Sequence, residues 1–177
     1  YQSFGSRQAA NMMTSRSRLI IDTNVLIDLH CGHALKALFA LPYQFIAPDV
    51  IIEELREPDG RDLTHLGLKS GELSSERVLE VEQLSQHHAN IAVNDLFALV
   101  LAASTGFHLL TGDSRLRKLA DRHNVTVHGT LWILDEMVAQ GTLKPVEASR
   151  ALRAMLDQGR RLPLAECQER IRIWEGK

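Results

Sequence analysis

The chain has 177 residues, a length that suits one ordinary domain and can bury a substantial core. Apolar residues make up 45% and charged residues 24%, so collagen-like, low-complexity and intrinsically disordered classes are excluded. Lys and Arg total 20 against 22 Asp and Glu, and this net charge of −2 provides no general basic field for nucleic acid. Any contact with nucleic acid must therefore be local.

Neither a membrane segment nor a cysteine-based site is expected. No uncharged apolar run approaches the ~18 residues of a membrane span, and no signal peptide is recognisable. The two cysteines, Cys31 and Cys167, lack the spacing of a zinc site and argue against a disulfide scaffold. We therefore expect a cytoplasmic protein with no membrane partner.

The first third of the chain alternates between strand and helix signals. Residues 1–17 are polar and patternless, and we expect a disordered N-terminus or vector-derived residues there. A strand over 18–22 leads into a helix that begins at Thr23, and a second strand over 44–47 leads into a helix that begins at Pro48-Asp49. Three glycines interrupt residues 59–73, which we predict as loop with one short strand.

The middle of the chain continues this alternation. An amphipathic helix is predicted from Ser74 to about residue 87, and Asn94-Asp95 are expected to cap a helix over 96–103 that is apolar on nearly every face. A strand over 107–111 precedes Gly112, and Asp113 opens the next helix. A strand over 125–127 follows, and three helices are predicted over 131–139, 146–156 and 164–174. Such alternation predicts an α/β fold with a parallel sheet covered by helices on both faces.

Four acids occupy strand ends or helix beginnings in this arrangement. Asp22 ends the first strand, Glu54 lies on the helix after the second strand, Asp95 lies in the first turn of the buried helix, and Asp113 follows a strand by one glycine. The functional crevice of an open parallel sheet lies outside the carboxyl ends of its strands. Each acid alone is better explained as a cap, a first-turn acid or a surface residue, so only their shared placement indicates a site.

Converging carboxylates repel one another unless a cation neutralises them. Hard oxygen ligands without Cys or paired His favour Mg²⁺ or Mn²⁺. Such a metal site activates a water and clamps phosphate oxygens, so hydrolysis of nucleic acid is the natural reaction.

Four segments resemble, in order, the motifs of PIN-domain ribonucleases: LIIDTN at 19–24, IEEL at 52–55, ND at 94–95 and LTGDSRLR at 110–117. The match runs from about Leu19 to Val138, and the tail from Val127 onward resembles a bacterial, VapC-like toxin branch. This resemblance implies a three-layer α/β/α sandwich, metal-dependent cleavage of RNA and a small antitoxin as partner. It also implies a nuclease domain over 18–140, with a C-terminal helical extension over 141–177 packed on the same domain.

The resemblance also assigns site residues. It assigns metal binding and catalysis to Asp22, Glu54, Asp95 and Asp113, and it makes Asn24, Thr111 and Ser114 candidate supporting residues. Glu53 and Glu54 are separated by one helical step of about 100°, so only one of them can face the pocket. We choose Glu54 because it directly precedes Leu55.

Two arginines follow Asp113 within the last motif. Arg115 and Arg117 are candidates for phosphate contacts beside the acids, although a solvated helix face explains them as well.

The leading interpretation is a Mg²⁺- or Mn²⁺-dependent endoribonuclease, the toxin-like member of a toxin-antitoxin pair. A catalytically inactive PIN-like module that binds nucleic acid or protein remains open. A dehalogenase-like phosphatase with Asp22 as nucleophile is disfavoured, because Asn24 stands where such enzymes carry a second Asp. The RNA that is cut, the number of metal ions, a cognate antitoxin and a homodimer are left open.

Overall fold

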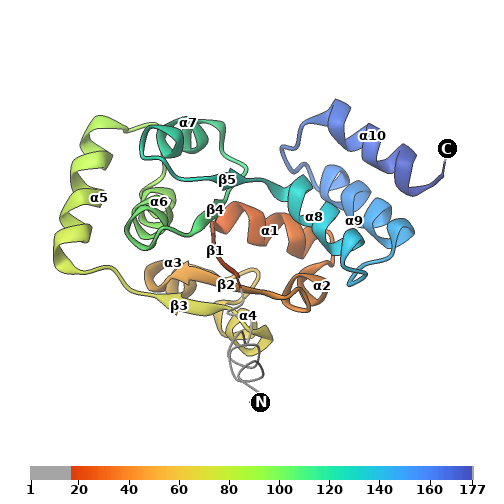
Figure 1. The fold of residues 1–177 in the computed structure, drawn as a ribbon, viewed down its shortest axis with the longest axis horizontal. Coiled ribbons are helices and arrows are strands. Elements are labelled where there is room, and N and C mark those ends of the chain that lie inside the picture. Colours follow the sequence, from red (N-terminus) through yellow and green to blue (C-terminus); the bar gives the residue numbers. More distant parts are fainter. Residues whose placement is uncertain (1–16, 177) are drawn as a thin grey trace, which may run out of the picture.

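The computed structural model describes residues 17–176, in which five strands form one parallel sheet of order β3-β2-β1-β4-β5 (Figure 1). The strands are β1 (Ser17–Ile21), β2 (Tyr43–Pro48), β3 (Lys69–Gly71), β4 (His108–Leu110) and β5 (Val127–His128). Apart from Ser17, which begins β1, the segment 1–17 predicted to be disordered lies outside the described residues.

The helices follow the strands in the expected alternation. In residues 17–176 they are α1 (Thr23–Cys31), α2 (Leu35–Phe39), α3 (Asp49–Glu54), α4 (Gly60–Leu66), α5 (Ser75–His87), α6 (Val93–Thr105), α7 (Ser114–Arg122), α8 (Thr130–Ala139), α9 (Pro145–Asp157) and α10 (Leu164–Trp174). Among these described residues, no helix has both the length and the apolar character needed to cross a membrane.

The sheet lies between two helical layers, which confirms the predicted α/β/α sandwich (Figure 1). On one side α6 packs against β1, β2 and β4, with α5 and α7 beside it, while α1, α2 and α8 contact one another on the other side. The apolar end of β1 is buried at Leu19, Ile20 and Ile21, because this central strand is covered by both layers. Outside the second layer, α9 packs on α1, and α10 packs on α9.

Residues 59–73, predicted as loop with a short strand, contain β3 as expected but also the helix α4, so the loop prediction is wrong over 60–66. Asp59 caps this helix through the Arg61 amide at 2.7 Å, and Leu63 is fully buried. Gly60 lies so close to α3 that a Cβ there would come within 2.0 Å of the Ile52 carbonyl oxygen. Two of the three glycines therefore belong to this helix. Gly60 is its first residue, and Gly67, at φ 127°, is its C-cap.

The predicted cap of the buried helix is also wrong. The helix α6 begins at Val93 with Ala92 as its N-cap, and no side chain caps it. Asn94 and Asp95 lie inside the first turn, so their side chains are available for other contacts.

Candidate functional site

Two of the predicted acids flank the position where the strand order reverses. From β1 the chain moves to β2 and β3 on one side, and it returns to β4 and β5 on the other side. Asp22 directly follows β1, and Asp113 is the third residue after the adjacent β4, so both lie at the same carboxyl edge. Ligands of open parallel sheets bind at this reversal point.

Asp22 is a fully buried acid with one unused oxygen. Its side chain caps α1, because Oδ1 accepts a hydrogen bond from the Val25 amide at 3.0 Å. Oδ2 is also buried, and it has no hydrogen-bond partner in the described part of the chain. Burial raises the pKa of Asp22 to about 7; the nearby Thr111 hydroxyl and the Val25 amide lower it in part, and the charge of Asp95 raises it.

Asp95 and Asp113 are electrostatically coupled. Burial is the main reason that the pKa of Asp95 rises to about 6, and the negative charge of Asp113 adds to the shift. Asp113 caps α7 through Oδ1, which accepts from the Arg115 and Leu116 amides at 2.7 Å each. The structure therefore places Asp22 near Asp95, and Asp95 near Asp113.

Glu54 lies on α3, the helix that follows β2, the strand beside β1. It ends α3 with an exposed side chain, and its Oε2 accepts a hydrogen bond from Asn94 Nδ2 at 2.9 Å. Because Asn94 precedes Asp95 in the first turn of α6, this contact ties Glu54 to the helix that carries the coupled acid.

The predicted supporting residues surround the same edge. Thr111 is buried, and its hydroxyl accepts a hydrogen bond from the Asp113 amide at 3.1 Å. Asn24 and Ser114 line a cleft of about 580 Å³ together with Asp113. This cleft is bounded on its far side by residues 159–161, in the loop between α9 and α10.

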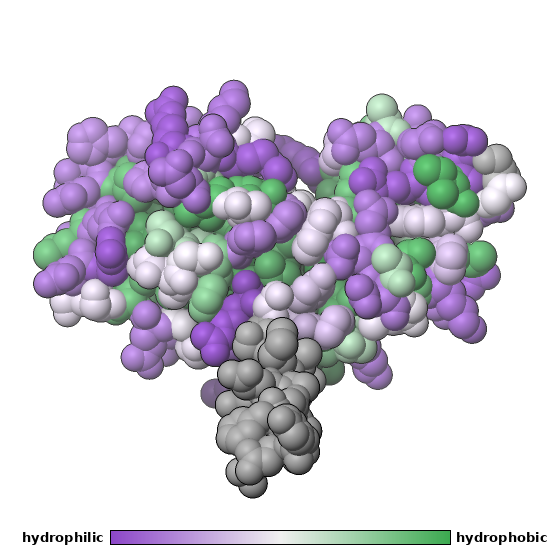
Figure 2. Space-filling view, in the orientation of Figure 1, coloured by the Kyte–Doolittle hydropathy of each residue, from purple (hydrophilic) through white to green (hydrophobic). Residues whose placement is uncertain are grey.

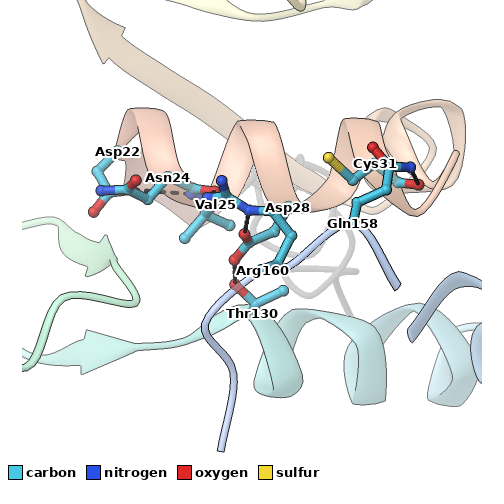
Figure 3. Close-up of polar contacts among 8 residues, drawn as sticks. All are labelled: Asp22, Asn24, Val25, Asp28, Cys31, Thr130, Gln158 and Arg160. Atoms are coloured by element: carbon cyan, nitrogen blue, oxygen red, sulfur yellow. Dashed lines mark hydrogen bonds and ion pairs between the residues drawn. The ribbon is translucent and has the colours of Figure 1, made fainter. Parts of the chain in front are cut away.

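The sequence interpretation did not include Asp28 or Arg160, which also line this cleft. Figure 3 shows both residues beside α1, where Arg160 Nε donates to Asp28 Oδ1 at 2.5 Å and the Thr130 hydroxyl donates to Oδ2 at 2.7 Å. Asp28 is 4% exposed, and water therefore does little to stabilise its charge. The ion pair with Arg160 neutralises that charge instead. The sequence signal for Asp28 was an acid placed among the apolar residues Leu26, Ile27 and Leu29. Its partner Arg160 could not be found in this way, because it is 132 residues away in the chain.

The side chain of Asp22 caps α1 with one oxygen, and its second oxygen has the properties of a cation ligand. Within residues 17–176, no three His, Cys, Asp or Glu side chains are gathered closely enough to hold a metal ion as they stand. The carboxylates instead approach in the pairs described above. A buried carboxylate oxygen without a partner, next to another acid, is stabilised when a cation binds to it. The donor set of oxygen atoms fits Mg²⁺ or Mn²⁺.

Sheet order and acid placement define an α/β protein with acids and a cleft at the carboxyl edge of its parallel sheet. A family model described as a PIN domain matches residues 18–176, and the chain belongs to the PIN-domain family. No curated protein matches the chain. PIN domains are generally nucleases that use divalent metals and bind nucleic acid, so membership indicates a nuclease-like function for this protein.

Proposed function

We propose that the protein is an endoribonuclease that hydrolyses phosphodiester bonds of single-stranded RNA with Mg²⁺ or Mn²⁺. The observation that carries this proposal is the buried Oδ2 of Asp22, which lacks a partner beside Asp95. Asp22, Asp95 and Asp113 would hold the metal, and Glu54 would join them from α3. A divalent cation bound there supplies an activated water and charge stabilisation at the scissile phosphate.

The residues around the acids support distinct roles. Asp22 and Asp113 are oriented by the helices they cap, because each uses one oxygen for backbone amides and leaves the other for a ligand. Asn94 would orient Glu54, and the Thr111 hydroxyl fixes the backbone of Asp113. These contacts hold the acids before the substrate arrives.

Arg115 and Arg117 are proposed as phosphate contacts on the α7 wall. Arg115 Nη1 donates to the Asn90 carbonyl at 2.9 Å, and Arg117 Nη2 donates to the Thr111 carbonyl at 3.2 Å. Each guanidinium keeps further donors for a phosphate, because arginine carries five N–H groups.

The experiment compares cleavage of a single-stranded RNA by wild type, Asp22→Asn and Asp62→Asn. We expect cleavage with Mg²⁺ or Mn²⁺, none in EDTA, and none by Asp22→Asn although this variant remains folded. Asp62→Asn is the matched control, because Asp62 is an exposed acid on α4 and should leave the rate unchanged. Full activity in excess EDTA would overturn the proposal, and RNA binding without cleavage by wild type would assign a non-catalytic PIN-like module.

We further propose a toxin-like role with a small antitoxin as partner, on the resemblance of the tail from Val127 to VapC-like toxins. An apolar helix of the partner could dock beside the acids, where Val93 is 51% exposed at the start of α6. Such a pair would act in the cytoplasm, with residues 18–140 as the nuclease domain and 141–177 as an extension packed on it.

Co-expression with the small neighbouring gene should give a stable, inactive complex. A monodisperse protein without partner or growth effect contradicts the toxin role, and a purified homodimer would show that a second copy covers this surface instead.

A further inference from the structure

A second cleft continues across the surface from the first cleft, which Asp113 lines. It has a volume of about 560 Å³ and lies between the α7–β5–α8 region and the loop that joins α9 to α10. Gly112, Ser114 and Arg161 line both clefts, so the two form one continuous path. Figure 2 shows a notch in the molecular outline between the lobe that holds α7 and the lobe that holds α10, with hydrophilic side chains on both sides.

Arginines dominate the charged groups of the second cleft. Arg117, Arg161 and Arg170 line it, against the single carboxylate of Glu166. Arg170 is already paired with Asp135 at 2.8 Å, and Arg117 donates to the Thr111 carbonyl. In the described part of the chain, the exposed guanidinium of Arg161 makes no hydrogen bond or ion pair. Arg161 is therefore the cation most available to a ligand at the junction of the two clefts.

Aromatic rings form another part of the second cleft. His128 and Trp132 both line it, and their ring planes stack at 20° with centroids 4.0 Å apart. Both side chains are half-buried, so part of each is accessible from the cleft. Clefts that bind single-stranded nucleic acid combine basic groups for the backbone with aromatic surface for the bases.

The loop that carries Arg161 is fastened to the body of the protein on its N-terminal side. Arg160 is held by Asp28, whose second oxygen is held by Thr130 (Figure 3). Two residues earlier, Gln158 Nε2 donates to the Cys31 carbonyl at 3.1 Å. These contacts restrict the backbone next to Arg161, so this residue is held beside the cleft before a ligand binds.

We propose that the second cleft carries the single-stranded RNA on one side of the scissile phosphate, and that Arg161 binds the backbone phosphate at the junction. Asp28 is a positioning residue that acts through Arg160. This proposal rests on the proposed ribonuclease function, because it assigns the path of that same substrate. The first cleft reaches Asp113, and Arg161 lies where it meets the second cleft. This placement suits an RNA whose scissile phosphate lies beside the acids while the neighbouring phosphate meets Arg161.

The test measures binding of a fluorescein-labelled, single-stranded 12-nucleotide RNA in EDTA over a range of NaCl concentrations. One lost phosphate contact lowers the slope of log affinity against log salt by about 0.7 for a single strand. We expect Arg161→Ala to show this lower slope and several-fold weaker binding at low salt, while Arg161→Lys keeps the wild-type slope. Arg150→Ala is the matched control, because Arg150 is an exposed arginine on α9 that lines neither cleft.

A second pair of variants tests the positioning role. Asp28→Asn removes the ion pair but keeps the cation of Arg160, so it should show the reduced slope of Arg161→Ala only if Asp28 positions this loop. Arg160→Met measures separately the loss of the Arg160 cation, which lines the first cleft. A wild-type slope in Asp28→Asn would overturn the role of Asp28.

Cleavage by wild type with Mn²⁺ is measured in parallel. If wild type binds and cleaves but Arg161→Ala keeps the full slope, the proposed path is wrong and the ribonuclease function stands. If wild type neither binds nor cleaves the RNA, both proposals fall.

Discussion

Asn94 and Glu54 are joined by a hydrogen bond of 2.9 Å although they are 40 residues apart in the chain. The contact links the end of α3 to the first turn of α6, which begins the helix carrying Asp95. An exposed glutamate would otherwise sample many rotamers, so this amide orients the proposed fourth ligand toward the acids.

Asn94→Ala should weaken Mn²⁺ binding by about tenfold, because outer groups that orient ligands contribute on this scale. Both side chains are at the surface, so thermal stability without metal should change little. Titration calorimetry with Mn²⁺ measures the effect, with Gln86→Ala as a control at an exposed amide side chain on α5. An unchanged affinity of Asn94→Ala for Mn²⁺ would show that Asn94 does not support the metal site.

The metal-free protein should lose stability as pH rises from about 4 to 7. The pKa of Asp22 is raised from 3.8 to about 7, and that of Asp95 from 3.8 to about 6, so the folded state binds more protons than the unfolded state in this window. Stabilisation from these shifts is fully present below pH 3.8 and is lost as pH rises through the folded-state pKa values.

This effect is measured as the free energy of unfolding in EDTA at several pH values. Each extra bound proton gives a slope of about 1.4 kcal/mol per pH unit. Asp22→Asn should flatten the slope between pH 5 and 7, whereas Asp121→Asn, on the exposed surface of α7, should not. Equal slopes in wild type and Asp22→Asn would contradict the raised pKa.

Asp95→Asn should melt higher than wild type in EDTA, by an amount worth roughly 1 kcal/mol, because it removes a buried charge beside Asp113. Since no side chain caps α6, the substitution leaves the helix start intact. Added Mn²⁺ should reverse the order, because metal binding stabilises wild type by about 2.7 kcal/mol at a hundredfold excess over Kd. If Mn²⁺ raises the melting temperatures of wild type and Asp95→Asn equally, Asp95 is not a metal ligand.

Arg160→Ala should lower the free energy of unfolding by about 2 kcal/mol, because it leaves the carboxylate of Asp28 buried without its cation. Arg77→Ala removes an exposed ion pair with Glu80 on α5 and should cost less than about 0.5 kcal/mol. Urea denaturation compares the two. Equal costs would show that the Asp28–Arg160 pair contributes no more than a surface pair.

Local patterns were sufficient to predict most of the framework. The apolar run that ends at Asp22 predicts β1 and its carboxyl edge, and the Gly-Asp-Ser segment before Leu116 predicts the cap of α7, which the structure confirms. Both signals lie within a few residues of the element they define, because strand ends and helix caps are set by short-range hydrogen bonds.

Contacts between distant segments were not predictable from such patterns. Asp28 resembles an ordinary acid of α1 until Arg160 is brought beside it by the packing of α9 on α1. The cap of α6 was misplaced for a related reason: Asn94 is typical of a cap, yet its amide is used by Glu54 in another helix. Side chains used in tertiary contacts can resemble those used in local ones.

The stacked pair of His128 and Trp132 makes the second cleft observable by fluorescence. A protonated imidazole quenches an indole that it touches, and burial, with the charges of His108 and Arg117, lowers the pKa of His128. Emission from Trp132 should therefore stay high until the pH falls below the usual range of histidine. The chain has two tryptophans, and Trp174 at the end of α10 lines neither cleft. In a Trp174→Phe variant, the remaining tryptophan fluorescence would come from Trp132 and would report on the second cleft alone.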